Sequence, residues 1–121
     1  MGIRASTVRA FALSLPDAGE LETWETATFR VRNRIFCMFS DRERRVWIKS
    51  VQEEQLAVIA QDPAAFFSPP YVGSKGWIGA VLAKADGDEV RELITEAWRM
   101  TAPKRSVTAF DERDSGPGAR R

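Results

Sequence analysis

The chain has 121 residues, close to the usual size of a single domain, and its net charge of +1 is nearly neutral. It contains no histidine and a single cysteine, Cys37. These counts exclude an internal disulfide, catalysis by Ser-His-Asp or Cys-His groups, and zinc sites that need histidine. No run of about 20 apolar residues is available for a membrane helix, and no export signal is evident. We therefore expect a cytoplasmic domain that is not an enzyme and carries no metal or other cofactor.

The N-terminal half predicts one helix followed by strands. Apolar residues at helical spacing predict a helix from Ile3 to Ser14, and Pro16 ends it. From Leu21 to Ser50 the apolar period changes to two, which predicts successive strands of an antiparallel meander. We expect a hairpin turn at Asn33-Arg34, because Asn tolerates a left-handed backbone, and a longer loop from Asp41 to Arg44.

The segment after the meander predicts a second helix. Ser50-Val51-Gln52-Glu53 has the spacing of a capping box, in which the Ser50 hydroxyl bonds the Glu53 amide. The apolar side of this helix is expected to be Leu56, Ile59 and Ala60. Two prolines and a glycine exclude regular helix from 66 to 73.

The C-terminal third predicts a strand and a strongly amphipathic helix. Trp77 to Ala83 reads as the strand. Asp86 is a helix N-cap with Glu89 three residues later, and the helix should run to about Met100. Its core face is the helically spaced set Val90, Leu93, Ile94, Ala97 and Trp98.

The element order predicts a two-layer α+β fold, with helices packed on one face of an antiparallel sheet. We expect a single domain over residues 1–105. Residues 106–121 are rich in charge, Gly and Ser, and are expected to form a disordered C-terminal tail. Trp24 is expected to pack within a strand.

Several short motifs occur together in a distinctive order. They are Leu13-Ser14-Leu15-Pro16, Glu22-Thr23-Trp24, Thr28-Phe29-Arg30-Val31, Trp47-Ile48-Lys49, Pro69-Pro70-Tyr71-Val72-Gly73, Gly76-Trp77-Ile78-Gly79 and Ala97-Trp98 through Ala102-Pro103-Lys104. In order and spacing the chain resembles the MmcQ/YjbR family over about residues 6–105. The resemblance implies a CyaY-like fold and a DNA-binding label, and some members look like double-wing DNA-binding domains, in which a saddle-shaped sheet faces the duplex.

One sheet face is the candidate binding surface. Residues 30–49 hold seven cations against two carboxylates. Strand alternation places one set of residues in the core: Phe29, Val31, Val46, Ile48, Ile78, Ala80 and Leu82. The opposite face would carry Arg30, Arg32, Trp47, Lys49 and Trp77, with Lys75 in the adjoining loop. Cations beside flat aromatic rings suit phosphates and bases, although a sheet face exposed to solvent also carries Arg and Lys routinely.

Two functions are open at this point. The first is a monomeric DNA-binding module that docks this basic and aromatic face with weak sequence specificity, since phosphate contacts position a protein without reading sequence. The second is a protein-interaction or small-ligand module that uses the same face or the loop 69–77.

Overall fold

The computed structural model describes residues 2–114, with the side chain of the last residue left out. Its helices are α1 (Ala5–Ser14), α2 (Gln52–Gln61), α3 (Gly87–Thr101) and α4 (Lys104–Asp114), and a short 3-10 turn η1 covers Gly73–Lys75. Its strands are β1 (Ala18–Thr23), β2 (Thr26–Val31), β3 (Arg34–Ser40), β4 (Arg45–Ile48), β5 (Phe66–Phe67) and β6 (Ile78–Val81). None of these helices has the length and apolar content needed to cross a bilayer.

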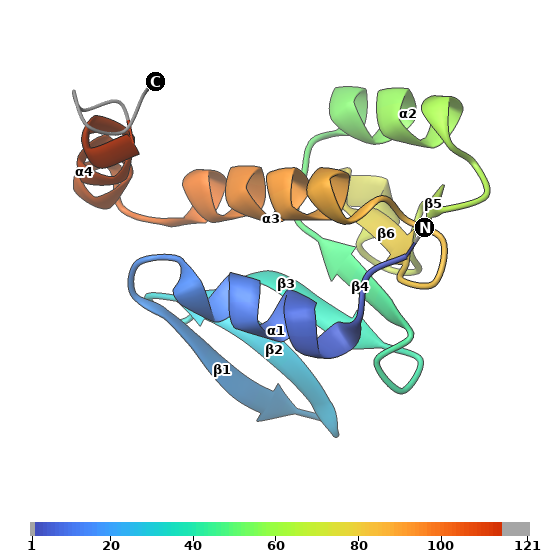
Figure 1. Ribbon diagram of the computed structural model, residues 1–121, viewed down its shortest axis with the longest axis horizontal. Coiled ribbons are helices and arrows are strands. Elements are labelled where there is room, and N and C mark those ends of the chain that lie inside the picture. The colour runs from blue at the N-terminus through green and yellow to red at the C-terminus, as the bar shows by residue number, and fades with distance from the viewer. Residues whose placement is uncertain (1, 115–121) are drawn as a thin grey trace.

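The six strands form one antiparallel sheet in the order β1-β2-β3-β4-β6-β5. Helices α1 and α3 lie on one face of it (Figure 1), which we call the inner face. The structure confirms the predicted α+β class and the meander, whose first strand begins at Ala18, three residues before the expected start.

The inner face forms the core. All seven strand residues that alternation assigned to the core are buried. Helix α3 presents the five buried residues predicted for it, and its N-cap is Asp86, whose carboxylate accepts from the Glu89 amide. Trp98 is fully buried and its indole N–H donates to the Pro16 carbonyl at 2.9 Å. This contact ties α3 to the turn between α1 and β1.

Helix α2 differs from the prediction. Its N-cap is Val51 with no side-chain cap, so the expected capping box of Ser50 and Glu53 does not form. Its buried side is Gln55 and Val58, while Leu56 is exposed. The apolar spacing predicted the wrong buried side because α2 packs at the edge of the sheet beside β5. There the buried side chain of Gln55 donates a hydrogen bond to the neighbouring loop.

Two turns also depart from expectation. The β2–β3 hairpin turns at Arg32-Asn33, both with positive φ (54° and 66°), one residue before the predicted position. Trp24 does not pack within a strand, because it is 92% exposed at the β1–β2 turn with φ of 50°. Two left-handed residues in succession are the geometry that a two-residue hairpin with right-handed twist needs, and here ordinary side chains adopt it.

The expected disordered tail is wrong over residues 106–114, which belong to α4. Val107 and Phe110 pack against the core, and the Phe110 ring lies 5.0 Å from Trp98 between centroids. Arg99 lies over the Phe110 ring and pairs with Asp111. The low apolar content of this segment predicted disorder, but two apolar side chains of α4 are enough to dock it on the core. Residues 115–121 lie outside the described part of the chain.

Helices α2 and α3 border a hollow of about 520 Å³ that is lined by carboxylates. Glu54 from α2 and Glu89, Glu92 and Glu96 from α3 face it, over an apolar floor that includes Leu93. Burial raises the pKa of Glu89, and the neighbouring carboxylates raise it further. The helix layer is therefore acidic at this place.

Replacing Phe110 by Ala tests the docking of α4. The side chain is half-buried, so we expect a loss of about 1–3 kcal/mol of unfolding free energy, below the 3–5 of a fully buried Phe. Urea denaturation followed by circular dichroism measures it. Thr108→Ala, on the exposed side of α4, should stay within about 0.5 kcal/mol of wild type. An unchanged midpoint for Phe110→Ala would show that α4 does not contribute to the core.

Replacing Glu89 by Gln tests the charge of the hollow. A carboxyl whose folded pKa is raised destabilises the fold when ionised, and this penalty is relieved as pH falls through the carboxyl range. Glu89→Gln should therefore raise Tm at pH 7 by a few degrees at most, with the gain vanishing near pH 4. Glu112→Gln on α4 removes the same charge elsewhere and serves as the control. A lower Tm at pH 7 would mean that the favourable interaction of Glu89 with the α3 dipole outweighs the repulsion.

Candidate nucleic-acid interface

A continuous row of side chains crosses the sheet on the face away from α1 and α3, which we call the outer face. Directly paired residues share a face, so strand register defines the row. It consists, from β1 to β5, of Leu21, Thr28, Met38, Trp47, Gly79 and Phe67. Leu21 is 51% exposed, and Met38, Trp47 and Phe67 are half-buried. The outer face is thus apolar and aromatic along its middle and partly open to solvent.

Phe67 of β5 ends this row, and its ring packs against Gly79 of β6. A Cβ at Gly79 would come within 2.4 Å of the Phe67 ring, so only a glycine leaves room for the ring against the sheet. The guanidinium of Arg45 lies 5.2 Å from the centre of the same ring. Arg45 also lies 3.8 Å from Asp41, a long and exposed ion pair that neutralises it weakly.

Arg30 is a cation fixed in place by neutral groups. Its guanidinium donates to Thr28 Oγ1 at 3.1 Å, to Thr23 Oγ1 at 3.0 Å and to Asn33 Oδ1 at 3.1 Å. No carboxylate among the described side chains pairs with it. Because a guanidinium has five N–H donors, two remain for an anionic ligand. Its orientation is therefore set in advance while its charge stays uncompensated.

Lys49, Trp77 and Lys75 come together at one end of the sheet. Lys49 follows β4 and Trp77 precedes β6, and continuing the β4–β6 register by one residue places them opposite each other. Both are half-buried, and Lys75 is exposed in η1 just before Trp77. Neither lysine pairs with a carboxylate in the part of the chain whose side chains are described.

Arg32 departs from the predicted pattern. It lies in the β2–β3 turn with a left-handed backbone conformation, and so is not a strand residue. Its side chain is exposed at the same end of the sheet as Lys49. Alternation therefore does not assign it to the outer face.

Trp47 lies in the outer-face row as expected, half-buried between its cross-strand partners Met38 and Gly79. Its indole N–H is buried and has no acceptor in the described part of the chain. A buried donor without a partner lowers stability. The large flat ring of Trp47 therefore occupies the outer face at a cost in folding free energy.

Sequence reasoning missed Arg45 and Phe67 as outer-face residues. Arg45 was available from alternation with Trp47, two residues later on β4. Phe67 was not, because β5 has only two residues and shows no periodicity.

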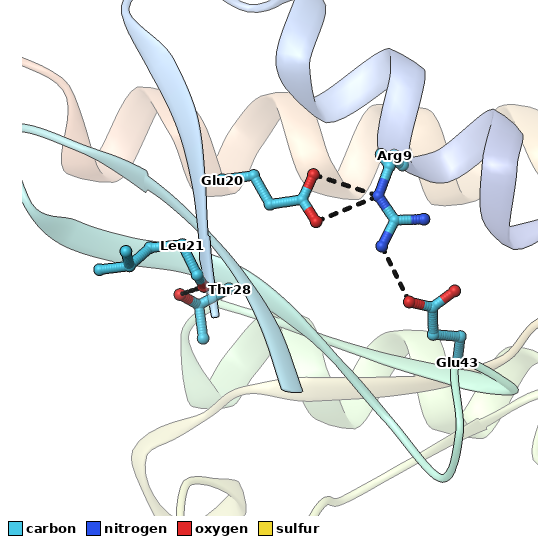
Figure 2. A network of polar contacts seen from close by, with 5 residues as sticks. All are labelled: Arg9, Glu20, Leu21, Thr28 and Glu43. Atoms are coloured by element: carbon cyan, nitrogen blue, oxygen red, sulfur yellow. Dashed lines mark hydrogen bonds and ion pairs between the residues drawn. The ribbon is translucent and has the colours of Figure 1, made fainter. Parts of the chain in front are cut away.

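Arg9, in contrast to Arg30, is a cation whose charge is neutralised by carboxylates. It projects from α1 and donates to Glu20 on β1 and, at 2.8 Å, to Glu43 in the β3–β4 turn (Figure 2). The hydrogen bond to Glu43 is the largest cause of a raised pKa for Arg9, and Glu20 raises this pKa further. The same view shows the Thr28 hydroxyl donating to the Leu21 carbonyl, which braces β1 against β2.

The remaining chemistry of the described residues is sparse. Burial raises the pKa of the Cys37 thiol, which makes a poor nucleophile of it. Within residues 2–114 no group of three or more Cys, Asp or Glu side chains is arranged to hold a metal ion.

Comparisons with solved structures confirm the fold. The crystal structure of Deinococcus radiodurans protein DR2400, a DUF419 domain, superposes with a TM-score of 0.77 over 98% of this chain and 96% of that one. The two sequences are 17% identical, so the likeness concerns the fold alone.

Two mycobacterial proteins, both described as uncharacterized, share sequence with this chain. Mb2600 of Mycobacterium bovis and Rv2570 of Mycobacterium tuberculosis are each 39% identical over 56 residues, which is 46% of this chain and 43% of theirs. The match thus spans less than half the length of these relatives. The model of the YjbR family matches residues 13–100, which include every strand, α2 and nearly all of α3. The chain belongs to the YjbR family.

Proposed function

We propose that the chain is a DNA-binding module that docks through the outer face of its sheet. The carrying observation is Arg30, a guanidinium fixed on this face with its charge uncompensated and two donors free. Lys49 and Lys75 supply further cations, and Trp47 and Trp77 supply apolar contacts to sugars or bases. The module acts in the cytoplasm, as a monomer and without a cofactor.

The mode of binding follows from the kinds of contact available. Arg and Lys reach phosphates, which fix the position of a protein on DNA and carry no sequence information. The outer face presents strands, and helices α1 and α3, which could otherwise enter a groove, lie on the opposite face of the sheet (Figure 1). We therefore propose weak sequence specificity and the docking mode of a double-wing domain, in which the sheet itself faces the nucleic acid.

A protein-interaction role is the second candidate, and Trp24 favours it. This side chain is 92% exposed at the β1–β2 turn, between the exposed Glu22 and Glu25. An exposed Trp is typical of interface hot spots, and the carboxylates beside it repel phosphates. This role would use the end of the sheet opposite to Lys49.

The triple variant Arg32→Glu, Lys49→Glu and Lys75→Glu tests the DNA-binding proposal with three cations at the end of the sheet near Arg30. Arg30 itself is kept, because replacing it would also break its three side-chain hydrogen bonds. The three replaced side chains make no hydrogen bond or ion pair in the described structure, so the fold should be preserved. With three to five phosphate contacts, wild type should show a log–log salt slope of about −3 to −5 in fluorescence anisotropy with a labelled duplex. The triple variant should lose binding almost completely, and each single Ala variant should reduce the slope by about one.

The matched control is Lys84→Glu, Lys104→Glu and Arg105→Glu, three exposed cations away from the outer face. It changes net charge equally and should keep most of the affinity. If both triple variants lose affinity equally, net charge and not the outer face governs binding. If wild type shows no salt-dependent binding, the protein-interaction role becomes the better candidate.

A further inference from the structure

Tyr71 is an aromatic side chain that the fold does not use. It is 90% exposed, so its ring contributes almost nothing to the core. Its φ of 65° is a left-handed conformation that costs an ordinary residue free energy. A glycine or asparagine would suit this backbone better, so the aromatic ring is explained neither by packing nor by the turn.

The loop that carries Tyr71 is held rigidly. Gln55 of α2 is buried, and its amide nitrogen donates to the Gly73 carbonyl at 2.9 Å and to the Trp77 carbonyl at 2.6 Å. Within the loop, the Gly73 amide donates to Pro69 and the Trp77 amide to Val72. A braced loop reduces the backbone entropy that a partner must remove on binding.

The loop that carries Tyr71 also carries Lys75 and packs against the segment that follows Lys49. Gly76, with φ of 99°, lies so close to the backbone of Val51 and Gln52 that a Cβ there would come within 2.5 Å of it. The loop is thereby held against the segment that follows Lys49, and Lys75 belongs to the loop itself. An exposed aromatic ring thus accompanies two cations that no described carboxylate neutralises.

We propose that Tyr71 stacks on an unpaired base of a nucleic acid whose phosphates contact Lys49 and Lys75. The inference rests on the proposed function and deepens it by naming the substrate class, which is DNA with a single-stranded stretch. Inside a duplex the base faces are covered by neighbouring bases, whereas an unpaired base offers its face to an aromatic ring. Stacking tolerates any base, so this preference is for structure and not for sequence.

The test compares a labelled duplex with the same duplex carrying a four-nucleotide single-stranded gap, in fluorescence anisotropy at two salt concentrations. Wild type should bind the gapped probe about 5- to 150-fold more tightly, the range for stacking one base. Tyr71→Ala should bind both probes equally and keep the salt slope of wild type. Tyr71→Phe keeps the ring and should keep the preference.

Trp24→Ala is the matched control, because Trp24 is equally exposed and also left-handed but lies at the other end of the sheet. It should leave both affinities unchanged. Salt-dependent binding without a preference for the gap, or a preference that survives Tyr71→Ala, would overturn this inference while the proposed function stands. Absence of salt-dependent binding to either probe would overturn both.

Discussion

The packing of α3 on the inner face of the sheet organises the rest of this molecule. Trp98 is its centre, since the ring is fully buried, its N–H reaches the Pro16 carbonyl, and Phe110 of α4 packs against it. Once one face of an antiparallel sheet is dry, a slip of one residue in any strand would send apolar side chains into water. The helix layer therefore fixes the register, and the register in turn fixes which side chains form the outer-face row.

The outer face combines two properties that a merely solvated sheet does not require. Its middle is apolar, from Leu21 through Trp47 to Phe67, and its cation Arg30 is not neutralised by any described carboxylate. Arg9 and Arg99, which project from helices, are paired with carboxylates, whereas Arg30 on the outer face is held only by hydroxyl and amide oxygens. The hollow between α2 and α3 is acidic instead. This separation of charge would orient the protein toward a polyanion, because like charges repel phosphates from the helix layer.

The two ends of the sheet also differ in the charge of the residues around their exposed aromatic rings. At one end the loop 69–76, braced by Gln55, carries both Tyr71 and Lys75. At the other end Trp24 stands between Glu22 and Glu25. Both aromatic residues accept a left-handed backbone, so in each case a local conformational cost is met by stability from elsewhere in the fold. The chemistry around each ring, and not its exposure, decides which partner it suits.

The sequence alone determined the fold class, the inner-face core and the face of α3, because those residues follow the period of a strand or a helix and their burial depends mainly on that period. It also identified Arg30, Trp47, Lys49 and Trp77 as one surface. Tertiary structure decided what periodicity cannot express. Gln55 is buried because the carbonyls of a distant loop need a donor, and α4 docks because Trp98 offers Phe110 a surface. Arg32 is a turn residue of the β2–β3 hairpin and not a strand residue. Phe67 lies on the outer face because β5 pairs with β6. The burial of Gln55, the docking of α4 and the placement of Phe67 depend on contacts between separate segments of the chain, about which local pattern carries no information.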